Sequence, residues 1–251
     1  MSSNEKVIVV GLGEIGRPLM RILGGRYEVA GVDTQPVQIS GPCSVLHICL
    51  PFQIPHFIET VAAYIFKYRP ALAIINSTVA PGTTRKVQDA VGAHLVAYSP
   101  VRGKHVRMES DLLRYRKFVG APRPDALQMA LEHFRGAGFK TAAFRTPELG
   151  ELSKLLETTA LGILVGWAQE VERAAAQYGG TFGEVNAFIE EIDFLPAHIF
   201  PGHIGGHCVM PNIQILQRHF RSNFLAAVVE SNERKMREDL AHQLALKQAA
   251  S

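Results

Sequence analysis

The chain has 251 residues, of which 47% are hydrophobic and 20% charged, values typical of a globular protein with a sizeable core. Its formal net charge of +3 is too small to favour nucleic acid or an anionic membrane as a partner, and its basic residues are spread along the chain. There is no signal sequence and no apolar run approaching the roughly 18 residues of a membrane span, and three unpaired cysteines indicate a reducing, cytoplasmic setting.

The first part of the chain alternates short apolar runs with segments of helical periodicity. Strands are predicted at 6–10, 27–32, 45–49, 72–75, 94–97, 116–119 and 139–144. Helices are predicted at 15–23, 55–68, 83–91 and 124–135. Strands separated by helices favour an α/β fold with a doubly wound parallel sheet of the Rossmann type.

The pattern changes after Pro147. One long helix is predicted over 148–178, followed by helices at 181–192 and 223–249. Gly162 and Gly166 lie four residues apart in the long helix, a spacing that allows a neighbouring helix to approach closely. We therefore expect an α/β domain over residues 1–146 and a smaller, all-helical domain over residues 147–251.

A glycine-rich turn follows the first predicted strand. The sequence GLGEIG places Gly11, Gly13 and Gly16 in the G-x-G-x-x-G pattern that binds dinucleotides. Gly11 permits the tight turn, Gly13 lets a pyrophosphate approach the backbone, and Gly16 lets the helix pack on the strand. The N-terminus of that helix offers N–H donors to the phosphates. The alternative is a glycine turn that binds no nucleotide.

Asp33 stands at the end of the second predicted strand, close to the spacing of about 20 residues expected for a ribose-binding acid. Its carboxylate would accept a hydrogen bond from the 2′-hydroxyl of the adenosine ribose and repel a 2′-phosphate. The sequence therefore predicts NAD, rather than NADP, as the cofactor.

Polar residues also follow the fourth and fifth strands, whose carboxyl ends line the ligand crevice of an open parallel sheet. Ser77 and Thr78 are predicted to face the cofactor or substrate, while Thr83 or Thr84 could cap the next helix. After the fifth strand, Arg102, Lys104, His105 and Arg107 suit a phosphate or carboxylate on the substrate. A solvated basic loop is the alternative for that second group.

Cys208 lies in a run rich in glycine and proline, FPGHIGGHCVMPN, which predicts a tight loop over residues 200–212. A thiol presented by such a loop is a candidate nucleophile, although most free cysteines are small buried hydrophobes. A metal site formed by Cys208 with His198, His203 and His207 fits no standard zinc spacing, so no metal is predicted. Lys154, in the long helix, is by itself an ordinary exposed lysine.

Taken in order, the pieces GLGEIGRPL, ICLPF, NSTVAPGTT, SPVRGK, ELSKLLETT and GGHC resemble the UDP-glucose/GDP-mannose 6-dehydrogenase family. The resemblance extends from Val7 to about Asn212. It implies an NAD-dependent oxidation of a primary alcohol in which Cys208 forms a thiohemiacetal and then a thioester. It also implies that Lys154 stabilises the oxyanion or moves protons, and that Thr78 lies near the nicotinamide.

The chain departs from the family pattern at three positions. Val101 stands where the family commonly has Glu, Thr158 where it has Asn, and Asn212 where it has Asp. In the family these groups handle the water that hydrolyses the thioester. The family's third domain, which binds the nucleotide of the sugar, is not expected within these 251 residues. The loop SPVRGK is also similar to the substrate loop of the related β-hydroxyacid dehydrogenases.

These observations predict an NAD-dependent dehydrogenase that oxidises a hydroxyl group of a small anionic or sugar-like substrate. Two alternatives remain, a single two-electron oxidation of β-hydroxyacid type without covalent catalysis, and a non-catalytic NAD-binding regulatory protein. A homodimer is expected, because the long helix and the last helix present large apolar faces.

The predicted site residues fall into three sets. The predicted catalytic residues are Cys208, Lys154 and Thr78. Predicted contacts to the cofactor are Gly11, Gly13, Glu14, Ile15, Gly16, Asp33, Leu50, Pro51, Ser77 and Thr78. Predicted contacts to the substrate are Arg102, Lys104, His105, Thr158, His207 and Asn212.

Overall fold

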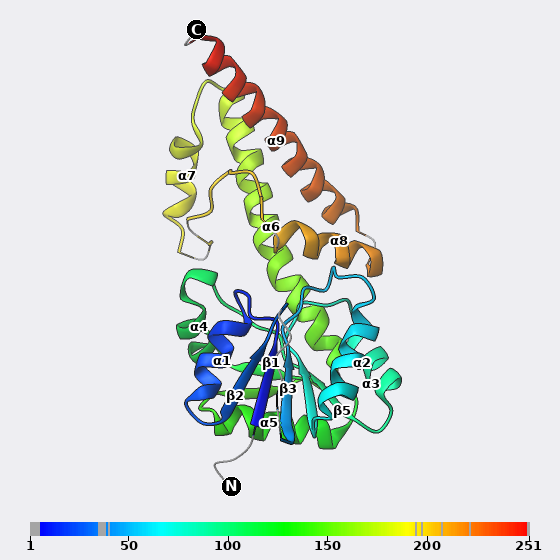
Figure 1. Ribbon diagram of the computed structural model, residues 1–251. Coiled ribbons are helices and arrows are strands. Elements are labelled where there is room, and N and C mark those ends of the chain that lie inside the picture. Colours follow the sequence, from blue (N-terminus) through cyan, green and yellow to red (C-terminus); the bar gives the residue numbers. More distant parts are fainter. Residues whose placement is uncertain are drawn as a thin grey trace. The chain divides into compact units, whose positions relative to one another are not determined.

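The computed structural model describes residues 6–34, 39, 41–193, 195–196, 198–206, 208–220 and 222–249. These residues form two compact units, one up to Lys154 and the other from Leu155 onward. The first unit contains the β-sheet, and the second is built from helices (Figure 1).

The first unit is organised around a parallel sheet with the strand order β2-β1-β3-β4-β5. The strands are β1 (Lys6–Val10), β2 (Glu28–Val32), β3 (Cys43–Ile48), β4 (Leu72–Ile75) and β5 (Leu95–Tyr98). The strand order reverses between β1 and β3, and an open parallel sheet binds ligands at the carboxyl ends of the strands at such a switch point. A short parallel pair, β6 (Lys117–Val119) and β7 (Thr141–Ala143), is joined to β5 by the bridge between Tyr98 and Gly120.

Helices cover both faces of this sheet (Figure 1). On one face lie α1 (Gly16–Gly24), α4 (Met108–Arg114) and α5 (Pro124–Gly136), and on the other lie α2 (Phe57–Tyr68) and α3 (Thr83–Val91). A single 3₁₀ turn, η1 (His105–Arg107), precedes α4. Because both faces are buried, the strands are apolar at nearly every position rather than at alternate ones.

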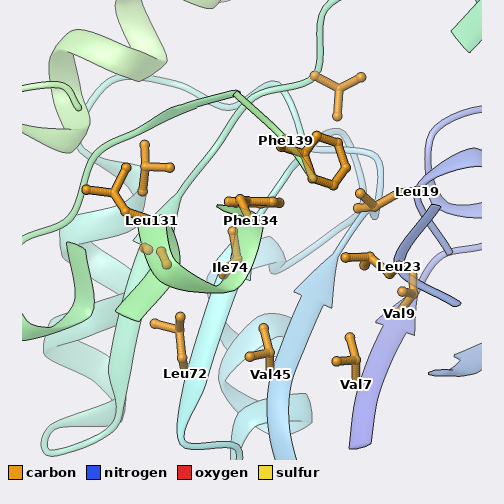
Figure 2. Close-up of a cluster of buried hydrophobic side chains, with 14 of the residues drawn as sticks. Val7, Val9, Leu19, Leu23, Val45, Leu72, Ile74, Leu131, Phe134 and Phe139 are labelled. Atoms are coloured by element: carbon orange, nitrogen blue, oxygen red, sulfur yellow. The ribbon is translucent and has the colours of Figure 1, made fainter. Parts of the chain in front are cut away.

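Successive residues of β1 serve two separate cores. Val7 and Val9 belong to the cluster on the α5 side, which Figure 2 shows, whereas Ile8 and Val10 belong to the cluster on the α2 side. This alternation follows from the two-residue period of a strand. Phe134 of α5 is fully buried at the centre of the first cluster. Each such side chain contributes about 1.5–3 kcal/mol on burial.

The second unit comprises the later turns of α6 (Pro147–Gln177) together with α7 (Phe182–Glu190), α8 (Val209–His219) and α9 (Asn223–Ala249). A Cβ atom added to Gly162 would lie 2.8 Å from Val209 and 3.0 Å from Ile213, and one added to Gly166 would lie 3.7 Å from Val228. The two glycines therefore admit α8 and α9 of the same chain. Within the described ranges, no helix has the length and apolar character that crossing a bilayer requires.

The predicted fold class, a Rossmann-type parallel sheet accompanied by helices, is confirmed. The loop predicted over 200–212 is wrong in its last residues, because α8 begins at Val209. Pro211 is tolerated as the third helical residue, since the first N–H groups of a helix have no intrahelical partner. Helix α4 is a second element that the sequence did not indicate. The predicted division of the chain into a domain of residues 1–146 and a domain of residues 147–251 stays a prediction.

Candidate functional site

The glycine-rich turn after β1 has the geometry that the sequence predicts. Gly11 adopts φ +88°, and a Cβ atom at this position would lie 2.7 Å from the carbonyl oxygen of Cys49. A Cβ atom on Gly16 would lie 1.8 Å from the carbonyl oxygen of Gly11. At Gly13, in contrast, no atom lies within 4 Å of an added Cβ atom. The turn is thus closed on its protein side and open at Gly13, where a pyrophosphate would lie.

Helix α1 starts directly after this turn, with Ile15 as its N-cap residue and no side-chain cap. In its first turn, however, Arg17 donates its N–H to the carbonyl of Gly13 at 3.2 Å, and Pro18 has no N–H, so this helix end offers an anion fewer backbone donors than a regular helix would. Asp33 is exposed and directly follows β2, the strand beside β1. The glycine-rich turn and Asp33 therefore stand at the ends of neighbouring strands. This donor set fits a dinucleotide with a free ribose hydroxyl.

Ser77, which follows β4, is buried and donates from its hydroxyl to the carbonyl of Leu50 at 2.5 Å. Leu50 and Pro51 form the turn after β3, and their side chains are half-buried and exposed respectively. Thr78 is half-buried. By binding the backbone carbonyl of Leu50, Ser77 fixes the path of the turn after β3. This turn lies beside the switch point.

Glu151 of α6 joins the start of that helix to the start of α3. Its carboxylate accepts from the N–H of Gly82 at 2.6 Å and from the N–H and hydroxyl of Thr84 at 2.7 and 2.6 Å. Glu151 is fully buried, and this burial raises the pKa of its carboxyl above the ordinary value. The α3 N-terminus is thus capped from α6, and not by Thr83 or Thr84 as the sequence allowed. Lys154 follows Glu151 by one turn and is half-buried.

The basic loop after β5 is more constrained than the sequence indicates. Arg102 donates to the carbonyl of Arg116 at 2.8 Å, and its guanidinium lies over the rings of Tyr115 and Phe118, 5.5 and 5.2 Å from their centroids. These contacts hold Arg102 within its own unit. Lys104 is exposed.

His105 and Glu14 are paired, with 3.0 Å between His105 Nδ1 and Glu14 Oε2. The sequence assigned them separately, Glu14 to the cofactor and His105 to the substrate. Their contact brings the glycine-rich turn and the loop after β5 together. Within the first unit, one predicted cofactor residue, Glu14, and one predicted substrate residue, His105, are therefore in contact.

A buried chain of hydrogen bonds, which the sequence did not indicate, lies below the carboxyl edge of the sheet. His47 of β3 bonds to Asn76 through Nδ1 and to His133 of α5 through Nε2, each at 2.9 Å. Asn76 donates to the carbonyl of Ser99 at 2.7 Å, and Lys117 donates to the same carbonyl at 2.9 Å. The only sequence signals were a histidine and a lysine inside otherwise apolar strands.

Burial shifts the pKa values of the side chains in this hydrogen-bonded network. It lowers the pKa of Lys117 to about 7 and that of His133 to about 4, and it holds the pKa of His47 well below its usual value. Burial also raises the pKa of Cys49 to about 12 and that of Cys43 to about 11, so both thiols stay protonated at neutral pH.

In the second unit, Cys208 is half-buried and is the N-cap residue of α8. Negative charge is stabilised at this end of a helix, which suits a thiolate nucleophile. Asn212 lies one turn further on, is buried, and donates from Nδ2 to the hydroxyl of Thr158 at 3.0 Å. Two of the positions that depart from the family pattern are therefore in direct contact.

The segment that leads to Cys208 is held by side chains of α6 and α9. Asn232 accepts from the N–H of Ile204 at 2.7 Å and donates to the carbonyl of the same residue at 3.2 Å. Gln169 donates to the carbonyl of Gly202 at 2.9 Å. This support was not predicted, because it joins backbone groups to side chains that lie far away in the sequence.

The predicted substrate contact His207 lies outside the described residues. Of the histidines considered as metal ligands, His198 contacts Glu190, with 3.8 Å between Nδ1 and Oε1, and His203 is exposed.

The chain was compared with protein families, curated proteins and solved structures. No family model matches. UDP-N-acetyl-D-mannosamine dehydrogenase of Methanococcus maripaludis is 23% identical over 91% of this chain and 65% of its own length. The enzyme of the same name from Pyrococcus horikoshii is 26% identical over 62% of this chain and 40% of its own length. The chain thus spans less than two thirds of these relatives.

Solved structures show the same fold. UDP-D-ManNAc dehydrogenase from Pyrococcus horikoshii has a TM-score of 0.85 with 20% identity, over 98% of this chain and 72% of that one. UDP-glucose dehydrogenase from Pyrobaculum islandicum has a TM-score of 0.75 with 19% identity, over 92% and 68%. 3-Hydroxyisobutyrate dehydrogenase from Mycobacterium tuberculosis has a TM-score of 0.69 with 17% identity, over 95% of both chains. The resemblance to the UDP-glucose/GDP-mannose 6-dehydrogenase family is confirmed over most of the chain.

Proposed function

We propose that this chain, whose homologues are nucleotide-sugar dehydrogenases, is an NAD-dependent dehydrogenase that oxidises a hydroxyl group of a sugar-like or small anionic substrate. The observation that carries the proposal is the glycine-rich turn at the switch point of a parallel sheet, open only at Gly13. Lys154 and Cys208 occur in family order after it. In this proposal, residues 1–146 bind the cofactor, and residues 147–251 serve substrate binding and dimerisation.

The cofactor would be held by the turn from Gly11 to Gly16 and by Asp33. The pyrophosphate would lie against Gly13 and the N-terminus of α1, and the ribose hydroxyls against Asp33. Ser77 holds the Leu50 turn, and with Thr78 it would border the nicotinamide. When bound, NAD supplies the hydride acceptor.

Each side chain that meets the substrate has a defined task. The Lys154 ammonium stabilises the negative charge that develops on the substrate oxygen as the hydroxyl proton leaves. After the first oxidation, the Cys208 thiolate adds to the aldehyde carbon, a C–S bond forms, and the carbonyl oxygen takes a proton. Oxidation of this thiohemiacetal, in which its carbon loses a hydride and its hydroxyl loses a proton, would give the thioester. Water would then add to the thioester carbon and break the C–S bond, which would release the thiolate and give the carboxylate. Each of the two oxidations would need one bound NAD as the hydride acceptor.

The substrate-facing groups of the first unit favour an anion. Lys104 and His105 bring basic groups to the carboxyl edge of the sheet, while Arg102 shapes the loop that carries them. The relatives carry the name UDP-N-acetyl-D-mannosamine dehydrogenase, so UDP-N-acetylmannosamine is the first substrate to test. A smaller sugar acid or hydroxyacid, which basic groups also suit, is the second choice.

The test measures NADH formed per molecule of UDP-N-acetylmannosamine, UDP-glucose or a 3-hydroxyacid in the wild type and in Cys208→Ala. Covalent catalysis predicts two NADH per substrate in the wild type, and in Cys208→Ala a loss of the second equivalent or of most of the rate. Lys154→Met should reduce kcat while leaving the Kd for NAD unchanged. If NAD binds and none of the three substrate classes is oxidised, a non-catalytic NAD-binding role replaces the proposal.

A second candidate is a single two-electron oxidation of β-hydroxyacid type. It is favoured by the contact between Asn212 and Thr158, because neither an amide nor a hydroxyl supplies the carboxylate that would activate water. The fold match to 3-hydroxyisobutyrate dehydrogenase extends over 95% of both chains. A yield of one NADH per substrate, unchanged by Cys208→Ala, would select this reaction.

We still propose a homodimer, but from exposed apolar side chains of α6 and α7 rather than from the glycines of α6. The glycines of α6 are occupied by helices of the same chain, whereas Leu161 and Trp167 of α6 and Phe188 of α7 are largely exposed apolar side chains. Such surfaces are usually covered by a partner. Sedimentation at twice the 27.5-kDa chain mass would support the dimer, and a single species of monomer mass would reject it.

A further inference from the structure

Lys117 is a charged side chain placed where an apolar one would be expected. It is the first residue of β6, only 3% of its surface is exposed, and its ammonium lies 5.2 Å from the centre of the Phe134 ring. Its Nζ donates to the carbonyls of Ser99 and Pro100, each at 2.9 Å. These two carbonyls lie where β5 ends and the basic loop begins.

Asn76 provides a second donor to the same place. Its Nδ2 lies 2.7 Å from the carbonyl of Ser99, which can only accept, so its Oδ1 must face His47. His47 Nδ1 therefore carries a proton. Burial keeps His47 neutral, so its Nε2 accepts, and His133 Nε2 donates to it. One consistent set of donors and acceptors thus runs from α5 to the end of β5.

The consequence for the loop is a fixed starting direction. The Ser99 carbonyl receives two donors, one for each lone pair, and the Pro100 carbonyl receives one. Two residues further on, Arg102 returns to bond the carbonyl of Arg116, the residue before Lys117. The loop is therefore attached to the start of β6 at both points.

We propose that Lys117, together with Asn76, is a positioning residue that sets the geometry of the loop over residues 99–105. This positioning role rests on the proposed function, in which the loop contacts the substrate. Lys117 does not touch the reacting atoms and acts through the backbone of Ser99 and Pro100. A lysine that served only to fill the core would be replaced at no loss by methionine, which has a similar volume and no charge to desolvate.

The matched pair of variants is Lys117→Met and Lys140→Met. Lys140 is an exposed lysine just before β7, the strand that pairs with β6, so its replacement controls for removing a charge nearby. Hydrogen–deuterium exchange is measured on full-length protein for peptides covering the loop over 99–105 and the glycine-rich turn over 11–17. The KM for UDP-N-acetylmannosamine and the Kd for NAD are measured on the same samples.

For Lys117→Met we expect exchange in the loop to rise about tenfold or more, because the carbonyls of Ser99 and Pro100 lose a buried donor, with no change in the glycine-rich turn. The substrate KM should rise by a similar factor, while the Kd for NAD and all parameters of Lys140→Met stay at wild-type values. Lys117→Arg, which retains donors, should recover part of the protection.

The proposal is overturned if exchange in the loop is unchanged, or if it rises equally in the loop and the glycine-rich turn, since the latter outcome marks a general loss of stability. A selective rise in loop exchange in a protein that oxidises none of the substrates would uphold the positioning role and reject the proposed function. The two failures are therefore distinguishable.

Discussion

Asn212 donates a hydrogen bond to the hydroxyl of Thr158 across 3.0 Å, so two residues that differ from the family pattern are in direct contact, with Asn212 buried and Thr158 half-buried. Asn212 also lies one helical turn beyond Cys208, whose carbonyl accepts from its N–H at 3.4 Å. In the family pattern an Asp and an Asn hold these positions. The change replaces a group that can accept a proton with one that cannot.

Asn212→Asp should restore a proton acceptor one turn from the thiol. The new carboxylate loses the hydrogen bond that Asn212 now donates to Thr158, and it can accept from that hydroxyl only if the hydroxyl turns away from the Leu155 carbonyl, to which it donates at 3.0 Å. We expect formation of the second NADH to accelerate by at least about tenfold, because general-base catalysis contributes that much or more. Stopped-flow measurement of NADH follows both equivalents. Asn212→Leu is the control and should show no acceleration; equal rates in wild type and Asn212→Asp would contradict the prediction.

Gly13→Ala and Gly16→Ala form a matched pair, since both add one methyl group to the same turn. At Gly13 the methyl meets no atom within 4 Å, so stability should stay within about 0.5 kcal/mol of wild type while NAD affinity falls at least about tenfold. At Gly16 the methyl would lie 1.8 Å from a backbone oxygen, so the protein itself should be destabilised. Calorimetric titration with NAD and denaturant unfolding separate the two effects. Equal losses of stability would exclude an open phosphate site at Gly13.

Glu151→Gln should destabilise the first unit by about 1–3 kcal/mol, because one of the donors at the start of α3 would then face an NH₂ group. Urea unfolding measures the change. Glu148→Gln is the control, because Glu148 pairs with Arg85 at the surface, where an ion pair contributes about 0–1 kcal/mol. A smaller effect at Glu151 than at Glu148 would show that the buried cap contributes little.

Acid should weaken the protein through the buried histidines. The folded pKa of His133 is lowered from 6.5 to about 4, so the unfolded chain binds its proton more readily. The free energy of unfolding should therefore fall as the pH drops from about 6.5 to about 4, by a contribution on the order of 3 kcal/mol. Denaturant titrations across this range measure the slope. His133→Phe should flatten it, whereas replacement of the exposed His242 by Gln should not.

The elements with a clear period were predictable from the sequence. The bounds of β1, β4, α3 and α9 agree with the prediction. Helix α4 was missed because seven residues are too short to establish a helical period, and α8 was missed because the glycine- and proline-rich run that reaches into its first turn predicted a loop.

The candidate site likewise has a part that the sequence predicts and a part that it does not. The glycine-rich turn is formed by neighbouring residues, so the spacing of its glycines in the sequence predicts its backbone geometry. The contacts of His47 join residues 29 and 86 positions away, and the contact between Asn212 and Thr158 spans 54 positions. Periodicity within one element contains no information about such pairs. A polar residue inside an apolar strand, such as Lys117, signals that a partner exists without identifying it.

The hydrogen bonds from Asn232 to Ile204 have a consequence for mutation. Both engage the backbone of Ile204, so the path of the chain there depends on a side chain 28 positions away rather than on the local sequence. Most replacements at Ile204 preserve the contact, and only proline removes the N–H. A substitution at Asn232 would therefore remove both hydrogen bonds to Ile204 at once, whereas the Ile204 side chain, only 8% exposed, contributes through packing and Gln169 still holds Gly202.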